Sequence, residues 1–261
     1  MNDTSEARGN NVLRKSLLLV LLSFAQGFSV AAASAVKPLA LSTDEVVIGA
    51  SRVVFHENQG RAYVDVRNQS TKSRLLSAGL YALDADSLQA GERVSDFVCS
   101  PGVTILRADG TVPVRIVRAE KKLPEDRESA YLLRLRLIPE KDVESVEESG
   151  RVKTVFTTFL KVFYRPTALD KPQAVQSAAA KVLWRACAGG IEFRNPTPYW
   201  LTLAQAESDG KPLISEKARR PMLAPLGGTV RLEGAAPKHT LEIRVLTDQG
   251  FETDPIGLLT K

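Results

Sequence analysis

The stretch Arg151–Pro166, RVKTVFTTFLKVFYRP, constrains the fold of this chain more than any other. It is rich in β-branched and aromatic residues and ends at a proline, as expected for a strand. At sixteen residues it is longer than an ordinary strand, so part of it is expected to extend beyond its own sheet. Read with a period of two, one face carries Val152, Thr154, Phe156, Thr158, Leu160, Val162 and Tyr164. A strand with surplus length and an apolar row is suited to pairing with another protein.

The N-terminus has the pattern of a secretory signal peptide. Arg14 and Lys15 precede the short apolar run 16–25, and Ala33-Ser34-Ala35 is a small-residue cleavage signature. The alternative is a transmembrane anchor, but the dense apolar run is too short for one. We therefore expect cleavage near Ala35, with residues 1–35 removed, and a soluble, exported mature protein that has no later membrane span.

Composition argues against two further classes of protein. The net charge is +5, but Lys and Arg are spread along the whole chain, whereas nucleic-acid-binding proteins usually concentrate them. The two cysteines, Cys99 and Cys187, are too few for a disulfide scaffold. We expect them in different domains as unpaired thiols. A bridge between them stays open as an alternative, because only their distance decides it.

No pattern in the sequence indicates catalysis. The two histidines, His56 and His239, stand alone, and no Cys/His metal spacing, Walker loop, G-x-G-x-x-G or G-x-S-x-G is present. Neighbouring acids such as Glu125-Asp126 lie in polar stretches and are interpreted as solvated charge. The sequence therefore predicts no catalytic residue, no metal site and no cofactor, and a protein that is not an enzyme.

Short alternating strands separated by turn residues follow one another from Val46 onward. Their spacing of roughly 8–12 residues is typical of an all-β sandwich, and long amphipathic helices are missing. The predicted strands are Val46–Phe55, Arg61–Asn68, Arg74–Leu83, Arg93–Cys99, Val103–Leu106, Thr111–Val117, Tyr131–Ile138 and the long stretch 151–166.

A second, shorter β pattern begins after a change in composition. Residues 167–180, with Pro172 and many small side chains, are interpreted as a linker, with weak helical periodicity around Ala174–Lys181. The sequence thus predicts two β-sandwich domains, 36–166 and 181–261. The second one has strand candidates at Val182–Arg185, Ile191–Arg194, Tyr199–Ala206, Gly228–Leu232 and Leu241–Leu246.

Several separated stretches, taken together, resemble one protein family. In chain order they are SRVVF at Ser51–Phe55, LPEDRES at Leu123–Ser129, YLLRLRLIPE at Tyr131–Glu140, LKVFYRP at Leu160–Pro166 and NPTPYW at Asn195–Trp200. Their order and spacing resemble the PapD-like periplasmic chaperones of chaperone–usher pilus assembly. The resemblance covers most of Val46–Asp248.

The resemblance implies two immunoglobulin-like domains in an angled, boomerang-like arrangement with a cleft between them. It also implies a periplasmic chaperone that binds, folds and caps pilus subunits, including adhesins, by donor-strand complementation. The implied partners are those subunits and an outer-membrane usher that receives them, with a self-capped dimer as a possible free state. Nucleic acid and membrane insertion are not expected.

The resemblance also assigns roles to particular residues. Arg52 and Lys161 match the pair of cations that holds the C-terminal carboxylate of a subunit. Glu128, Arg165 and Asp248 resemble a salt-bridge network between the domains. The donor-strand residues that would enter the subunit are Val152, Thr154, Phe156, Thr158 and Leu160, and the parity of Lys161 differs from theirs.

This chain departs from the family pattern at several points, which indicates a divergent clade; Thr154, for example, is smaller and more polar than the residue expected there. Cys99-Ser100-Pro101-Gly102 replaces a common double-proline segment, and no cysteine pair occurs near the C-terminus. Two alternatives to a pilus chaperone stay open at this point. One is a fimbrial or surface-fibre component with tandem sandwiches, and the other is a chaperone of the same fold that serves a non-pilus fibre.

Overall fold

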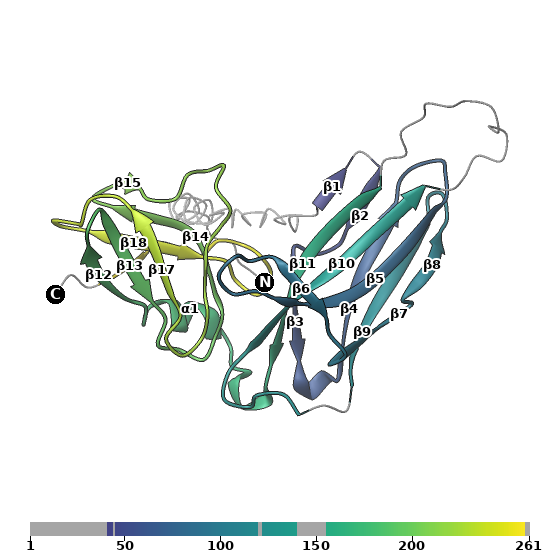
Figure 1. Ribbon diagram of the computed structural model, residues 1–261, viewed down its shortest axis with the longest axis horizontal. Helices are drawn as coiled ribbons and strands as arrows, with labels where there is room; N and C mark the ends of the chain where they lie inside the picture. The colour runs from purple at the N-terminus through teal and green to yellow at the C-terminus, as the bar shows by residue number, and fades with distance from the viewer. Residues whose placement is uncertain (1–40, 44, 120–121, 140–154, 259–261) are drawn as a thin grey trace, which may run out of the picture. The chain divides into compact units, whose positions relative to one another are not determined.

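The computed structural model describes residues 41–43, 45–119, 122–139 and 155–258, and nearly all of their regular structure is β-strand (Figure 1). The predicted signal segment, residues 1–35, lies outside the described residues, as do Val152 and Thr154. The all-β prediction with two β-sandwiches is confirmed. In the described part of the chain, no helix has the length and apolar character needed to cross a membrane.

The first sandwich consists of two sheets, with strand orders β1-β2-β4-β9-β7 and β3-β11-β10-β5-β6, and β8 also pairs with β5. A short 3-10 turn, η1 (Glu57–Gln59), follows β3. The strands are β1 (Leu41–Thr43), β2 (Val46–Ile48), β3 (Arg52–His56), β4 (Arg61–Asn68), β5 (Arg74–Leu83), β6 (Ala90–Arg93), β7 (Phe97–Ser100), β8 (Val103–Leu106), β9 (Thr111–Arg118), β10 (Ser129–Pro139) and β11 (Phe156–Arg165).

The first strand segment of this sandwich changes sheets. The sequence predicts one strand over Val46–Phe55, but β2 pairs with β4 in one sheet and β3 pairs with β11 in the other. The chain crosses between the sheets at residues 49–51, where the amide of Gly49 still donates to Asp65 O at 2.9 Å. The predicted strand Arg93–Cys99 is likewise divided between β6 and β7, which belong to opposite sheets. The buried positions change parity at the first crossing, from Val46 and Ile48 to Val53 and Phe55, so this segment is not one continuous alternating strand.

Alternating residues of both sheets fill the first core. Aromatic rings pack edge to face at its centre: the ring centroids of Phe55 and Phe97 are 5.1 Å apart, and those of Phe97 and Tyr131 are 5.0 Å apart. Burying each such side chain stabilises the fold by roughly 1.5–3 kcal/mol. This core fixes the inward face of β11, the strand that carries the candidate site.

The second sandwich has its own core. Its sheets have the orders β12-β13-β17 and β15-β14-β18-β19, and β16 pairs with β14. The strands are β12 (Leu183–Cys187), β13 (Gly190–Arg194), β14 (Leu201–Ser208), β15 (Lys211–Pro212), β16 (Met222–Leu223), β17 (Thr229–Glu233), β18 (Leu241–Val245) and β19 (Ile256–Gly257).

Two short helical segments occupy the stretch between β11 and β12, which the sequence predicts to be a linker. η2 (Thr167–Leu169) follows β11 directly, and α1 (Ala174–Ala179) comes next. Ala174, Val175, Ala178 and Ala179 are buried in the second core. This part of the stretch therefore packs as part of the second sandwich.

Cys99 and Cys187 are both free thiols and both half-buried. Burial raises the pKa of Cys99 to about 11, so its thiol stays protonated near neutral pH. The described residues contain no group of His, Cys, Asp and Glu side chains that could hold a metal ion.

Candidate functional site

Strand β11 presents two different faces. Leu160, Val162 and Tyr164 are at most 1% exposed and belong to the first core, and Phe156 packs against that core from a partly buried position. On the opposite face Phe159 is 43% exposed. The face that carries Phe156, Thr158 and Leu160 is therefore the inward face of the sandwich.

One edge of β11 is half unpaired. On one side β10 pairs with β11 along Phe156–Tyr164. On the other side β3 pairs in parallel only along Lys161–Arg165. Over residues 156–160 no other strand in the described ranges pairs with this side. A backbone edge of this kind presents unpaired N–H and C=O groups, which are the groups that a further strand would bond.

Lys161 and Arg52 stand where the unpaired edge ends. They are register partners in the parallel pairing of β11 with β3. Lys161 is partly buried and makes no ion pair within the described part of the chain. Burial and, to a smaller extent, the positive charges of Arg52, Arg219 and Arg220 together lower the pKa of Lys161 to about 8. A neighbouring anion would relieve both effects.

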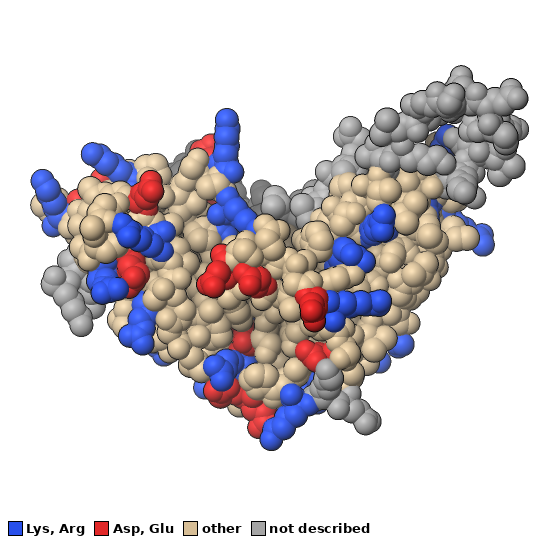
Figure 2. Space-filling model, viewed as in Figure 1, with Lys and Arg blue, Asp and Glu red and all other residues tan. Residues whose placement is uncertain are grey.

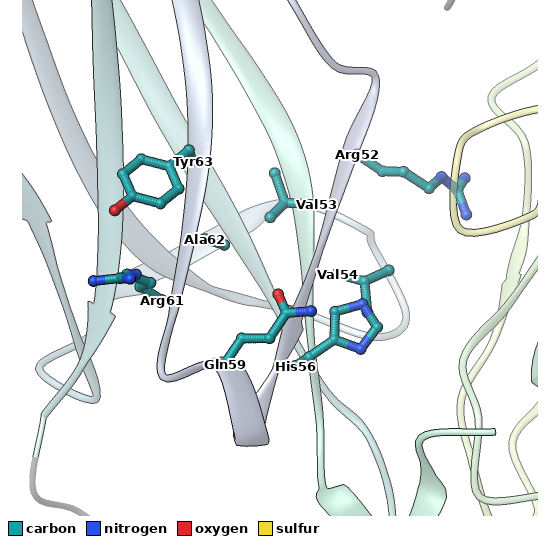
Figure 3. Close-up of a pocket in the computed structure, with 8 residues that line it drawn as sticks. All are labelled: Arg52, Val53, Val54, His56, Gln59, Arg61, Ala62 and Tyr63. Atoms are coloured by element: carbon teal, nitrogen blue, oxygen red, sulfur yellow. The ribbon is translucent and has the colours of Figure 1, made fainter. Parts of the chain in front are cut away.

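The guanidinium of Arg52 is held by weak contacts. Its Nη1 donates to Leu246 O at 3.4 Å, its Nε is buried without a hydrogen-bond partner, and its carbon lies 5.6 Å from the ring centroid of Phe163. Burial lowers the pKa of Arg52 to about 10, although Asp248 opposes that shift. Figure 3 shows this side chain extending away from Val53 toward the segment that contains Leu246.

A groove of about 650 Å³ lies beside β3 and η1 and the start of β4 (Figure 3). Eight residues line it: Arg52, Val53, Val54, His56, Gln59, Arg61, Ala62 and Tyr63. Lys161 does not line this groove, and the guanidinium of Arg52 points out of it. The candidate site is therefore the strand edge with its two cations, not this groove.

Arg165, at the end of β11, forms a closely bonded ion-pair network. Its Nε donates to Glu128 Oε1 at 2.7 Å, and its two terminal nitrogens donate to the two oxygens of Asp248, each at 2.7 Å. Glu128 Oε2 also accepts from the amide of Trp200 at 2.8 Å. Arg165 and Glu128 are about 2% exposed. The structure thus brings together the three residues that the sequence grouped. Arg165 ends β11, Glu128 directly precedes β10, and Asp248 lies in the segment after β18.

Both buried members of this network have shifted pKa values. Burial by itself lowers the pKa of Arg165, but the hydrogen bonds and negative charges of Asp248 and Glu128 raise it above its ordinary value. Burial raises the pKa of Glu128, and the positive charge of Arg165 opposes that rise. The ion pair is what makes these two buried charges tolerable.

Sequence reasoning missed two cations of the site. Arg219 and Arg220 lie between β15 and β16, in a stretch without strand alternation, and their charges act on Lys161. The only signal in the sequence is the adjacent basic pair before Pro221. Elsewhere, on the face shown in Figure 2, basic side chains are scattered and do not merge into one surface.

Two family models match the chain. The N-terminal domain of the PapD "pili and flagellar-assembly chaperone" family matches residues 45–170. The C-terminal domain of the "pili assembly chaperone PapD" family matches residues 177–256. Together they cover both sandwiches.

Individual relatives agree with these models. The chain is 28% identical over 210 residues to the chaperone protein FimC of Escherichia coli K12, covering 80% of this chain and 81% of FimC. It is 28% identical over 176 residues to the probable fimbrial chaperone YadV of the same organism, covering 65% and 71% of the two chains.

Solved structures share the fold. The Pseudomonas aeruginosa CupB2 chaperone has a TM-score of 0.63 at 25% identity, covering 81% of this chain and 99% of that one. A Salmonella enterica complex of the SafA pilin with the SafB chaperone has a TM-score of 0.68 at 23% identity, covering 84% and 98%.

These matches favour a chaperone over a fibre component, because the family models and FimC are named as chaperones. Chaperones of this kind act in the periplasm, and the family is not a known class of enzyme. The chain therefore belongs to the PapD-like family of pilus-assembly chaperones and is a chaperone for pilus subunits.

Proposed function

We propose that the protein caps a pilus subunit by adding the edge of β11 to the subunit's incomplete sheet. The observation that carries this proposal is the unpaired backbone edge at residues 156–160, which ends directly at Lys161 and Arg52. Addition of a strand supplies main-chain hydrogen bonds that depend little on sequence, while alternate side chains provide specificity. A chaperone for several subunits needs this combination.

Lys161 and Arg52 are proposed to bind the C-terminal carboxylate of the subunit. Lys161 has no ion-pair partner within the described residues, and Arg52 has a buried Nε without an acceptor. A carboxylate has two acceptor oxygens and can satisfy both groups through charge-assisted hydrogen bonds. Each such bond contributes roughly 1.5–3 kcal/mol when well formed, so the pair would fix the register of the bound strand.

The donor row is proposed to be Val152, Thr154 and Phe156. Phe156 is partly buried at the margin of its own core, and the other two lie outside the described residues. Thr158 continues the same row. Leu160 is fully buried in its own core, so its contribution to subunit binding is proposed to come through its backbone.

The remaining parts of the molecule complete this proposal. The network of Glu128, Arg165 and Asp248 is proposed to hold the two sandwiches together during capping. A signal peptide in residues 1–35, cleaved near Ala35, would direct the chain to the periplasm. An outer-membrane usher would accept the capped subunit, and a second copy of the chain could cover the free edge when no subunit is bound.

Co-expression with the secreted subunits encoded beside this protein tests the proposal. A one-to-one periplasmic complex should be recovered with the wild-type chain and lost with Lys161→Ala. Arg115 is the matched control, because it is an exposed cation on β9 of the opposite sheet. If Lys161→Ala and Arg52→Ala both bind as Arg115→Ala does, the carboxylate anchor is wrong.

A further inference from the structure

Arg219 and Arg220 carry positive charge from the second sandwich to the outward face of β11. They lie shortly before Met222, which packs against Phe163 and Leu88 in a small buried cluster. Arg219 also donates a guanidinium N–H to the carbonyl oxygen of Leu88. Packing and hydrogen bonding thus hold this basic pair close to Phe163.

The ring of Phe163 joins the basic pair to the proposed carboxylate anchor. The guanidinium of Arg52 lies 5.6 Å from its centroid, and Lys161 is two residues earlier on the same face of β11. The electrostatics agree with this geometry. The charges of Arg219 and Arg220 both lower the pKa of Lys161, and Arg220 lowers that of Arg52.

Positive charge is in excess around the anchor. Arg219 bonds to carbonyl oxygens and to no carboxylate among the described residues, while Arg220 donates to Glu252 Oε1 at 2.8 Å. Five cationic groups face three carboxylates here, which leaves two positive charges uncompensated. The cations are Arg52, Lys161, Arg165, Arg219 and Arg220, and the carboxylates are Glu128, Asp248 and Glu252. A single terminal carboxylate would compensate only one of the two.

We propose that the anchor receives two negative charges from one bound segment. The C-terminal carboxylate lies on Lys161 and Arg52, and an acidic side chain among the last four residues lies on Arg219 or Arg220. A guanidinium has five N–H donors, so both arginines keep donors beyond those already used. The ligand class is therefore an extended segment with an acidic C-terminal end. This inference rests on the proposed function, because it uses the same carboxylate anchor.

The probes are fluorescent synthetic peptides of alternating Val and Thr with a free C-terminal carboxylate. A parent peptide carries Gln at each of its last four positions, and each of four others replaces one of these by Glu. Fluorescence polarisation with the purified chain measures binding. At least one Glu peptide should bind about three- to tenfold more tightly than the parent, and the difference should shrink as salt rises from about 0.05 to 0.5 M.

Variants of Arg219 and Arg220 test whether these two residues cause the preference for Glu peptides. Arg219→Gln or Arg220→Gln should remove the preference for Glu, weakening the Glu peptides about three- to tenfold more than the Gln parent, whereas Arg115→Gln should alter neither. Both arginines are at least partly exposed, so the variants should fold, and thermal denaturation checks this. If no Glu peptide exceeds the parent, or if the preference survives both substitutions, the inference is overturned.

A parent peptide with a C-terminal amide separates this inference from the anchor on which it rests. Loss of binding on amidation, together with equal binding of the Glu and Gln peptides, would overturn the acidic preference and retain the anchor. If the parent peptide binds equally with a C-terminal amide and with a free carboxylate, both the carboxylate anchor and this inference are overturned.

Discussion

Lys161 and Arg52 face each other across two adjacent parallel strands, and neither is bonded to a carboxylate in the described part of the chain. Like charges at neighbouring strand positions destabilise a sheet, and burial increases the cost. The free protein therefore holds an electrostatically unfavourable pair at the end of its open strand edge. A bound anion would remove that cost, which supports the proposal that the pair binds a carboxylate.

Binding of a carboxylate at this pair should depend on pH in the alkaline range. In the free protein the pKa of Lys161 is lowered to about 8, so the ammonium is fully present only below that value. A bound carboxylate raises this pKa, so binding takes up a proton above about pH 8, and affinity should fall by up to about tenfold per pH unit there. Peptide binding measured from about pH 6.5 to 9.5 checks this.

Lys161→Arg is the control for this pH dependence, because a guanidinium keeps its charge throughout that range. Its binding curve should be flat where the wild-type curve declines. A decline of equal size in both proteins would assign the pH dependence to the ligand or to another group.

Loss of Arg165 should be the most damaging single change in the ion-pair network. Arg165→Met leaves the carboxylate of Glu128 buried without its cation, which should lower the free energy of unfolding by about 3–5 kcal/mol. Urea denaturation measures this. The double variant Arg165→Met/Glu128→Gln removes the stranded charge and should recover part of the loss. No recovery would mean that lost packing dominates.

Asp248→Asn should have a smaller effect on stability. Its side chain is 28% exposed, so water can compensate for part of the lost attraction to Arg165, and a loss of about 1 kcal/mol is expected. A loss as large as that of Arg165→Met would show that this pair is as well desolvated as the pair with Glu128.

Glu57 should make the protein sensitive to acid. The amide of Thr167, the hydroxyl of Tyr164 and the guanidinium of Arg118 all donate to its carboxylate, and they lower its pKa to about 2. Because the folded-state pKa is depressed, its stabilisation is complete above about pH 4.5 and is lost as pH falls toward 2. The Tm difference between wild type and Glu57→Gln should therefore be largest near neutral pH and should disappear by about pH 2. A constant difference would contradict this linkage.

The two faces of β11 should respond differently to a charge. Phe156→Glu places a carboxylate in the proposed donor row and should abolish recovery of the subunit complex. Phe159→Glu is the matched control, since this side chain lies on the opposite face and is 43% exposed. Circular dichroism should show both variants folded. Loss of the complex with Phe159→Glu alone would assign subunit binding to the other face.

Much of the architecture was predictable, because strand alternation and turn residues are local properties of the sequence. β4, β5 and β10 lie within one or two residues of their predicted bounds. The sheet change at residues 49–51 was not predictable, since the choice between β4 and β11 as a partner depends on the rest of the sandwich. The helix α1 appears in the expected linker because the second core buries Ala174 and Val175.

The candidate site likewise depends mostly on tertiary contacts, which the local sequence does not predict. Arg165, Glu128 and Asp248 could be grouped only through family resemblance, because their positions in the sequence are far apart and their bonds are tertiary. The roles of Lys161 and Arg52 remain predictions, although the structure places the two residues in register. Arg219 and Arg220 were missed, since an adjacent basic pair before Pro221 does not by itself point to a strand of the first sandwich.

The crossing of the first strand between sheets also limits how many residues of β11 a foreign strand can pair with. Because β3 begins at Arg52, it closes the edge of β11 from Lys161 onward, so a foreign strand can advance along β11 only until its leading end reaches that point. The start of β3 would therefore block a foreign strand from pairing further along β11, and Lys161 and Arg52 lie at that point. At about 3.4 Å per residue, one residue too many or too few would displace a terminal carboxylate by more than the length of a hydrogen bond. The chaperone would thus select a partner by the position of its C-terminal carboxylate as well as by its side chains.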